Sequence, residues 1–249
     1  MVAQVSIILP NYNSSKTIIA TVHSVIKQSF KNWELIIVDD CSNIKTKKIL
    51  SNFKKIKRIK IFYLKKNYGA GYCRNFAITK SNSNYLAFID SDDLWRKNKL
   101  QSQINFMKKK QYYLTYTHYN TFSFNNFKKN KIKTPLKFDF NSFVKNTSIA
   151  TSTMIVKKSL VKEIKFTNTK ICEDYYYKCQ LLKKIGHAYC YPSYLTDYQI
   201  RENSLQSNRI KNVYWMWKIN RTFNKFNFFR NFVSIFFISI NSLKKYGLK

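Results

Sequence analysis

Turn-forming residues and acids are both scarce in this sequence of 249 residues, which contains 3 prolines, 4 glycines and only 12 aspartates and glutamates. With so little proline and glycine, no flexible linker divides the chain, and it contains no internal repeat. A chain of 249 residues can bury one sizeable core, and its length excludes a small disulfide-stapled domain. A content of 45% hydrophobic and 17% aromatic residues also excludes a largely disordered chain.

Cysteine and histidine do not form the patterns of a disulfide framework or a zinc site. The 5 cysteines are odd in number, and no two of them have C-x-x-C spacing. The 3 histidines are isolated from one another, so each is assigned to the surface or the core. The N-terminal stretch also lacks the features of a signal peptide, and we therefore expect a reducing, cytoplasmic location.

No apolar run is long enough to span a bilayer. The most apolar stretch, residues 228–240, is interrupted by Arg230 and Asn231 and falls short of the roughly 20 residues that a spanning helix needs. The segment 208–249 is instead basic and aromatic, and no acidic residue follows Glu202. Two interpretations of this tail stay open: its helices lie on an anionic membrane surface, or its aromatic side chains cap the core.

The order of apolar patterns predicts an α/β fold. Short apolar runs alternate with segments of helical periodicity as far as residue 110. Strands are predicted at residues 5–9, 35–38, 59–64 and 85–89, and helices at 18–30, 43–53, 70–80 and through Leu100, Ile104 and Met107. This alternation favours a mainly parallel central sheet flanked by helices, with ligands at the carboxyl ends of the strands. Residues 112–143 show no clear pattern, and a strand at 152–156, a helix at 173–185 and a strand at 188–198 are predicted beyond them.

The few carboxylates are clustered. Seven of the 12 acids fall into three groups, Asp39-Asp40, Asp90/Asp92/Asp93 and Glu173-Asp174. The first two groups directly follow predicted strands, so the sheet would bring them to one edge. Convergent carboxylates repel one another unless a cation lies between them. The D-x-D spacing of Asp90 and Asp92 allows both to reach one divalent ion, and oxygen ligands favour Mg²⁺ or Mn²⁺.

Each group also has a less specific interpretation. For Asp40 and Asp93 we prefer the role of N-cap for the helix that follows. Glu173 and Asp174 also fit the first turn of a helix, where negative charge is favourable. A sequence pI near 10.0 with interspersed tyrosine and phenylalanine is typical of nucleic-acid-binding proteins, although no nucleic-acid-binding motif is present.

Four motifs, in order and in spacing, resemble those of the family-2 glycosyltransferases of the GT-A fold. They are residues 5–13 (VSIILPNYN), 37–40 (IVDD), 67–75 (NYGAGYCRN) and 88–93 (FIDSDD). The resemblance is close over residues 1–110, moderate over 150–207 and absent from the tail. It implies a GT-A domain at 1–207, with a nucleotide-binding half at 1–110 and an acceptor-side half at 111–207, and a basic aromatic helical tail at 208–249.

The resemblance implies that a UDP-sugar lies over the carboxyl edge of the sheet. Pro10 and Tyr12 would line the uridine pocket, and Asp39 would accept the uracil N3–H. Asp92 would be the main ligand of a Mn²⁺ or Mg²⁺ ion, and Asp90 would share this metal or hold the ribose. The remaining donor-site residues are Ser91, which lies between the two aspartates, Arg74, which would meet the nucleotide or diphosphate, and Asn67 and Gly69, which would shape the loop before it.

Glu173-Asp174 resembles the acceptor-side motif of the family, in which the aspartate is the expected general base. Asp174 would take the proton of the acceptor hydroxyl in an inverting single displacement, while the metal neutralises charge on the departing diphosphate. Relatives carry an arginine where this chain has Gln199, and Arg201 is a candidate replacement.

The family analogy also implies an acceptor and a location. The expected acceptor is a glycan or lipid-linked oligosaccharide of a bacterial surface polysaccharide, and the expected location is peripheral, on the cytoplasmic face of the inner membrane. No nucleic-acid partner is expected. The alternatives are a basic nucleic-acid-binding protein and a catalytically inactive partner subunit.

Overall fold

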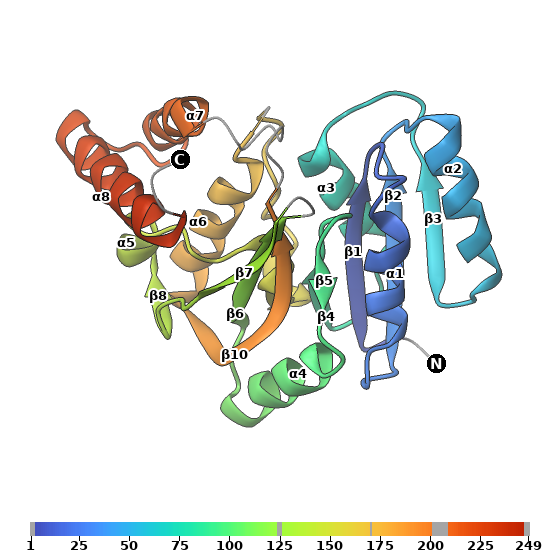
Figure 1. Ribbon diagram of the computed structural model, residues 1–249. Coiled ribbons are helices and arrows are strands. Elements are labelled where there is room, and N and C mark those ends of the chain that lie inside the picture. Colours follow the sequence, from blue (N-terminus) through green and yellow to red (C-terminus); the bar gives the residue numbers. More distant parts are fainter. Residues whose placement is uncertain (1–2, 124–125, 170, 201–208, 247–249) are drawn as a thin grey trace.

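The apolar runs of the N-terminal half form parallel strands in the computed structural model, which describes residues 3–123, 126–169, 171–200 and 209–246. The strands β1 (Val5–Asn11), β2 (Trp33–Asp39), β3 (Ile59–Tyr63) and β4 (Tyr85–Phe88) lie in the order β3-β2-β1-β4 (Figure 1). Every pairing among them is parallel. Because β1 and β2 are buried along their whole length, both faces of this sheet are covered.

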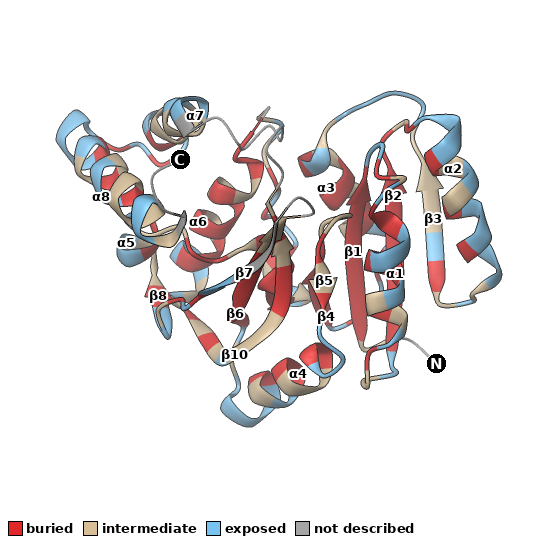
Figure 2. Cartoon of the chain, in the orientation of Figure 1, coloured by how far each residue is buried: buried red, intermediate tan, exposed pale blue. Residues whose placement is uncertain are grey.

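Helices cover the two faces according to the alternation of side chains along each strand. Ile7 and Leu9 of β1 share one core with α1 (Ile18–Ile26) and α4 (Lys99–Lys110). Ile8 points to the opposite face and shares the other core with α3 (Ala70–Lys80) and α6 (Glu173–Ile185). Figure 2 shows the resulting buried central strands between helices whose outer sides are exposed. The helix α2 (Ile44–Ser51) packs against the first of these cores through Leu50.

The second half of the sheet is mixed. It continues from β4 in the order β4-β9-β6-β10-β5, with β7 paired to β6 and β8 paired to β10. The long strands β6 (Leu114–Ser123) and β10 (His187–Gln199) are parallel to each other. The shorter strands β5 (Leu94–Trp95), β7 (Asn126–Ile132), β8 (Lys137–Asp139) and β9 (Ile155–Lys157) are antiparallel to their partners. The predicted α/β class with a mostly parallel sheet is confirmed.

Some predicted boundaries are wrong. The helix expected to reach Phe30 ends at Ile26. The strand expected at 152–156 begins later, because Thr151–Thr153 form a 3₁₀ turn and only Ile155–Lys157 pair with neighbours. The segment 112–143, which had no clear pattern, supplies β6, β7, β8 and the short helix α5 (Phe140–Phe143).

The C-terminal part of the chain is helical, as predicted. The helices α7 (Arg209–Thr222) and α8 (Phe228–Tyr246) lie beside α5 and α6, at the end of the molecule opposite β3 (Figure 1). Ile219 and Phe226 are buried in the same core as α6. Tyr175 of α6 donates a hydrogen bond through its hydroxyl to Asn220 Oδ1 at 2.8 Å. Among the described residues, no helix has both the length and the apolar character needed to cross a membrane.

Candidate active site

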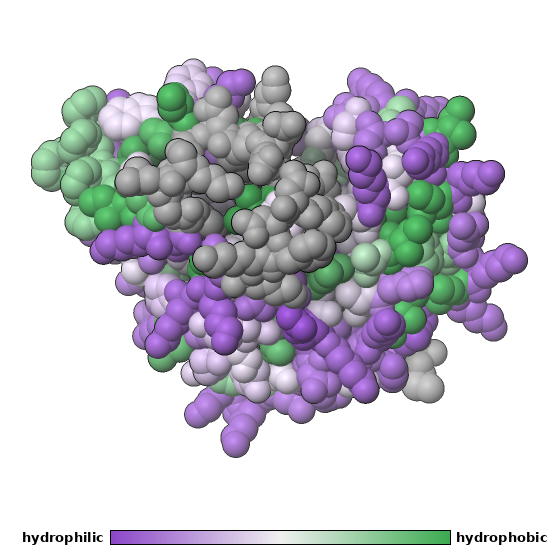
Figure 3. All heavy atoms as spheres, viewed as in Figure 1, coloured by the Kyte–Doolittle hydropathy of each residue, from purple (hydrophilic) through white to green (hydrophobic). Residues whose placement is uncertain are grey.

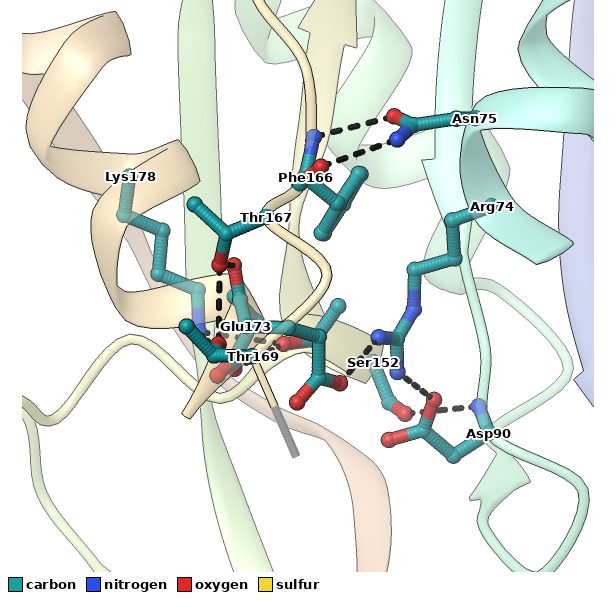
Figure 4. Close-up of polar contacts among 11 residues, drawn as sticks. Arg74, Asn75, Asp90, Ser152, Phe166, Thr167, Thr169, Glu173 and Lys178 are labelled. Atoms are coloured by element: carbon teal, nitrogen blue, oxygen red, sulfur yellow. Dashed lines mark hydrogen bonds and ion pairs between the residues drawn. The ribbon is translucent and has the colours of Figure 1, made fainter. Parts of the chain in front are cut away.

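Carboxylates from distant parts of the chain meet at the carboxyl edge of the parallel strands, around one arginine. Arg74 Nη2 donates to Asp90 Oδ1 at 2.6 Å, and Arg74 Nη1 donates to Glu173 Oε1 at 2.6 Å (Figure 4). Arg74 lies on α3, Asp90 follows β4, and Glu173 begins α6. A single guanidinium therefore joins the second acidic group of the sequence to the third.

Arg74 is a buried charge rather than a surface one. Its side chain is only 5% exposed. Burial disfavours the charged form, but the carboxylates of Asp90 and Glu173 outweigh this effect and raise the pKa of Arg74 above its ordinary value. Its buried Nε has no hydrogen-bond partner among the described residues, so one donor of the guanidinium is unused.

Two further contacts bring α3 close to the chain that precedes α6. Gly71 lies so near Thr167 that a Cβ at this position would be 2.4 Å from the Thr167 carbonyl oxygen. The Asn75 side chain makes two hydrogen bonds to the Phe166 backbone, one to the carbonyl oxygen and one from the N–H, both at 2.9 Å (Figure 4). The pairing of Arg74 with Glu173 therefore rests on a closely packed contact between backbones.

Asp39 joins the carboxyl ends of β1 and β2. Its Oδ1 accepts a hydrogen bond from Asn11 Nδ2 at 2.7 Å, and its Oδ2 accepts one from the Ser42 backbone N–H at 3.1 Å. Asp39 is fully buried and lies opposite Asn11 in the register of the two strands, so Pro10 and Tyr12 flank its partner, and Tyr12 is 51% exposed. Pro10, Tyr12 and Asp39 thus lie close together at the end of β1, although their predicted contacts with uridine stay a prediction.

Asp40 is not the N-cap of α2, so that prediction is wrong. Asn43 caps this helix by accepting the Thr46 N–H at 3.0 Å. The two carboxylate oxygens of Asp40 instead accept the backbone N–H groups of Tyr68 and Gly69, each at 2.7 Å. The reason is tertiary: the loop from β3 to α3 returns to the same sheet edge and offers unpaired N–H groups there.

The loop before α3 has the shape that its glycine allows. Gly69 lies immediately before the first residue of α3 and has a backbone φ of +90°, which residues other than glycine rarely adopt. Asn67 Nδ2 donates to the Asp40 carbonyl oxygen at 3.5 Å. Asn67 and Gly69 therefore both belong to a loop that Asp40 holds in place.

Asp93 is also not an N-cap, which corrects the second of these predictions. The helix α4 begins only at Lys99, after Asn98. Asp93 is 1% exposed, and its Oδ1 accepts the Gln199 backbone N–H at 2.9 Å. Burial, with the neighbouring charges of Asp92 and Asp90, raises the pKa of Asp93. Asp93 thus ties the D-x-D segment to Gln199 at the end of β10, the position where the family resemblance leads us to expect arginine. The candidate replacement, Arg201, lies outside the described residues.

Asp174 and Glu173 have opposite electrostatic environments although they are adjacent. Burial raises the pKa of Glu173, and this effect exceeds the opposing one of Arg74. Burial also acts on Asp174, but Lys178 and Arg74 outweigh it and hold the pKa of this carboxyl well below its usual range. Lys178 Nζ and Thr151 Oγ1 each donate to Asp174 Oδ2 at 2.6 Å. Asp174 is therefore an oriented carboxylate at neutral pH.

Sequence reasoning missed the two residues that hold Asp174. Lys178 follows Asp174 by four residues on a predicted helix, and this spacing is a signal that points to a pair. Thr151 precedes β9 by several residues, and nothing in the local pattern indicated a contact with α6.

The donor atoms near the D-x-D segment suit a hard divalent cation that arrives with phosphate. Within the described ranges, no group of three or more histidines, cysteines, aspartates and glutamates is arranged to hold a metal by itself. Asp90 and Asp92 offer oxygen atoms, and Asp90 is held in place by Arg74 through one of them. Mg²⁺ and Mn²⁺ sites often use one or two carboxylates and complete their shell with substrate phosphates and water. These residues fit such an ion.

Comparisons of the sequence identify its relatives. The profile of the family described as Glycosyl transferase family 2 matches residues 6–175. TuaG of Bacillus subtilis (strain 168), a glycosyltransferase named for teichuronic acid biosynthesis, is 36% identical over 228 residues, which are 91% of this chain and 90% of TuaG. WfgD of Escherichia coli, named as a UDP-Glc:alpha-D-GlcNAc-diphosphoundecaprenol beta-1,3-glucosyltransferase, is 33% identical over 216 residues, which are 86% of this chain and 84% of WfgD.

Solved structures share the fold at lower identity. A complex of S. aureus TarS 1-349 with UDP-GlcNAc matches 88% of this chain with a TM-score of 0.75 and 21% identity. This chain spans 64% of that TarS chain. The mannosyltransferase PcManGT from Pyrobaculum calidifontis, in complex with GDP-Man and Mn²⁺, matches 91% of this chain with a TM-score of 0.70 and 13% identity. The GT-A fold predicted for the sequence is therefore the fold observed.

Proposed function

Because this chain belongs to glycosyl transferase family 2 and is a glycosyltransferase, we propose that it transfers a sugar from a UDP-sugar to a hydroxyl of a lipid-linked or surface glycan, with inversion at the anomeric carbon. The observation that carries the proposal is the arginine that joins Asp90, on the expected donor side, to Glu173, on the expected acceptor side, at two distances of 2.6 Å. The named donor of WfgD and the UDP-GlcNAc bound to TarS support a uridine nucleotide.

The donor site would use the ends of β1 and β2. Both oxygens of Asp39 already accept a hydrogen bond, but each has a second lone pair that can accept the uracil N3–H. The half-exposed ring of Tyr12 can stack on the base, beside Pro10. The loop of Asn67 and Gly69, held by Asp40, would then place the start of α3 toward the nucleotide, and the buried Arg74 would act on the diphosphate side through its bond to Asp90.

Asp92 and Asp90 would hold a Mn²⁺ or Mg²⁺ ion in the proposed site, with Ser91 between them. When bound, this ion supplies positive charge to the diphosphate leaving group. Arg74 keeps Asp90 in a defined orientation, because its bond to Asp90 Oδ1 leaves the second carboxylate oxygen for other partners. The Mn²⁺ named with PcManGT supports the choice of ion.

Asp174 would be the general base. As the acceptor oxygen attacks the anomeric carbon, the bond from that carbon to the diphosphate breaks and the proton of the hydroxyl passes to Asp174. Thr151 and Lys178 orient the Asp174 carboxylate and keep it ionised. Glu173, paired with Arg74, fixes the start of α6 and thereby the position of its neighbour. No covalent sugar intermediate is needed.

The proposal includes an organisation and a location. Residues 1–207 would form the catalytic unit, with donor and acceptor halves that meet near residue 110, and residues 208–249 would form an appendage. The name of WfgD gives an acceptor carried on diphosphoundecaprenol. An acceptor of this kind would be reached from the cytoplasmic face of the membrane, by an enzyme in peripheral contact with it.

Calorimetric titration of UDP, with and without Mn²⁺, tests the proposal. Wild type should bind UDP more tightly with Mn²⁺, and Asp92→Asn should weaken this metal-dependent binding by at least about tenfold. Asp174→Asn should bind UDP with an affinity within about twofold of wild type and lose transfer by about 100-fold or more. The control is Glu163→Gln, which changes an exposed acid away from this edge of the sheet.

Three results would contradict the proposal. If Asp92→Asn kept the full effect of Mn²⁺, the D-x-D assignment would be wrong. If Asp174→Asn kept its turnover, the base would lie elsewhere. If wild type failed to bind UDP but bound single-stranded RNA with a steep dependence on salt, the basic charge would be the functional feature instead.

A further inference from the structure

The helix α8 turns its polar side toward the protein. Asn231 is fully buried, and Ser234 is 2% exposed. Asn231 Nδ2 donates to the Trp217 carbonyl oxygen at 3.1 Å, and its Oδ1 accepts from Asn220 Nδ2 at 3.0 Å. Ser234 Oγ donates to the Val144 carbonyl oxygen at 2.6 Å. The orientation of α8 is thus set by hydrogen bonds of buried polar side chains, which would be costly to break.

The opposite side of α8 is aromatic and exposed. Its large apolar side chains are between 39% and 75% exposed, and they are Phe228, Phe229, Phe232, Phe236, Phe237 and Leu243. We call these six residues the outer face of α8. Phe228, Phe232 and Phe236 follow one another at intervals of four residues, so they form a continuous stripe along the helix. Figure 3 shows hydrophobic residues gathered at the end of the molecule where α8 lies.

This arrangement reverses the usual amphipathicity of a surface helix. A helix on a globular protein normally buries its apolar stripe and exposes its polar side. Here the core of the domain is closed instead by Ile219 and Phe226, which are 0% and 3% exposed. Capping of the core therefore accounts for part of the tail but not for the outer face. Contiguous exposed apolar side chains mark surfaces that bind other molecules.

The surroundings of the outer face are cationic. No acidic residue occurs after Glu202, whereas α8 itself contains Arg230, Lys244 and Lys245. At its C-terminal end, a surface cavity of about 280 Å³ is lined by four lysines, by neutral polar residues and by one apolar residue, Ile132; the lysines are Lys131, Lys133, Lys244 and Lys245. We call this cavity the lysine pocket. None of the described residues that line it is acidic, so an anion is the ligand that it fits.

Lys245 is the inner lysine of this pocket. Its Nζ donates to Ser148 Oγ at 3.2 Å. Burial lowers the pKa of Lys245 to about 8, and a bound anion would favour its charged form. Ser148 lies on the chain that leads to Thr151, the residue that donates to Asp174. Ser148 therefore links the lysine pocket, along the chain, to the residue that orients Asp174.

We propose that α8 docks this enzyme on an anionic lipid surface, with the outer face between headgroups and acyl chains and a headgroup phosphate in the lysine pocket. The inference deepens the proposed function and rests on it, because a lipid-linked acceptor would lie in the same surface. A second copy of the chain is disfavoured as the occupant: each copy carries a formal charge of +33, and two copies would bring lysines together. Anionic headgroups complement that charge.

Flotation with vesicles tests the docking. The full chain is mixed with vesicles of phosphatidylcholine alone, or of phosphatidylcholine with phosphatidylglycerol. Wild type should float with the anionic vesicles. A variant with Phe229→Gln, Phe232→Gln and Phe236→Gln should lose at least about tenfold in partitioning. The matched control is Ile44→Gln, which removes an apolar side chain that is 85% exposed on α2, and it should float like wild type.

The lysine pocket has its own variant. Replacing Lys131, Lys133 and Lys244 by glutamine should reduce partitioning onto the anionic vesicles by about fivefold for each lysine, and it should leave any weak binding to phosphatidylcholine unchanged. Lys45→Gln with Lys48→Gln, on α2, is the matched control for charge, because both of these lysines are exposed far from α8. Inorganic phosphate added at the same ionic strength should not release wild type, since the outer face also contributes.

Several results would overturn the inference. Wild type could fail to float with anionic vesicles, or the triple phenylalanine variant could float like wild type. The α2 controls could also lose as much partitioning onto anionic vesicles as the α8 variants do. A dimer in sedimentation velocity that the phenylalanine changes abolish would assign the outer face to a second copy. UDP titration without vesicles is measured for every variant: intact UDP binding shows that the variant is folded, and it keeps a failure of docking distinct from a failure of the donor site.

Discussion

Replacing Arg74 by methionine should destabilise the protein strongly, because it leaves two carboxylates without their cation. Arg74 is 5% exposed and bonds Asp90 and Glu173 at 2.6 Å each, and the Glu173 side chain is only 12% exposed. Removal of one partner from a buried ion pair costs about 3–5 kcal/mol. Asp90 is 29% exposed and can be solvated, so we assign the lower end, about 3 kcal/mol. For a chain of this size this loss lowers the melting temperature by roughly 6–12 °C.

The destabilisation should depend on pH. Burial raises the pKa of Glu173 above its unfolded value even with Arg74 present, and loss of Arg74 raises it further. A carboxyl whose folded-state pKa is raised binds its proton more tightly in the folded protein, so stability falls as pH rises through that range. The penalty of Arg74→Met should therefore be larger at about pH 8 than at about pH 5, where Glu173 takes up a proton.

Urea unfolding followed by tryptophan fluorescence measures both effects. The matched control is Arg96→Met: Arg96 also pairs with an aspartate, Asp197 at 3.0 Å, but its side chain is 51% exposed. Because Asp197 keeps the hydrogen bond from Asn120 Nδ2, this variant should lose about 1 kcal/mol or less. If Arg74→Met were within about 1 kcal/mol of wild type at both pH values, the ion-pair bridge between donor and acceptor sides would be refuted.

Two further variants probe the neighbouring contacts. Lys178→Gln removes the cation that holds the pKa of Asp174 down, so the acidic limb of the pH–rate profile should move to higher pH. If this limb did not move, Asp174 would not be the titrating base. Gly71→Ala places a Cβ 2.4 Å from the Thr167 carbonyl oxygen, so α3 and the chain that precedes α6 must separate, at a loss of about 1–3 kcal/mol in urea unfolding. Unchanged stability would contradict the close approach of the two backbones.

Local pattern was sufficient for the parallel half of the sheet. The strands predicted at 5–9, 35–38, 59–64 and 85–89 match β1 to β4. Three of them, β1, β2 and β4, are nearly continuous apolar runs because they are buried on both faces, whereas β3 is only partly buried. The acidic groups after β2 and β4 were also placed correctly at one edge, since parallel topology decides where strands end.

The apolar periodicity of the sequence did not predict strands whose buried side chains are polar. In β6, Thr115, Thr117 and Asn120 are buried, so the strand does not alternate between apolar and polar residues. Asn120 donates to Asp197 of β10, a partner far along the chain. Periodicity reports local burial of apolar groups, and it contains no information about a polar group whose partner lies on another strand.

The same limit explains the errors at the acids. An aspartate after a strand is commonly an N-cap, and sequence reasoning assigned Asp40 and Asp93 that role. The two carboxylates instead accept hydrogen bonds from the backbone N–H groups of Tyr68, Gly69 and Gln199, which the fold brings to the same edge of the sheet.

By itself, the sequence determined the α/β class, the parallel strands, the family motifs and the presence of a basic aromatic helical tail, because each is written in residues close together along the chain. Only the tertiary structure decided that Arg74 joins Asp90 to Glu173, that Lys178 and Thr151 hold Asp174, and that α8 faces inward with Asn231 and Ser234. Those outcomes depend on hydrogen bonds and ion pairs between distant segments, whose partners are chosen by packing and not by local propensity.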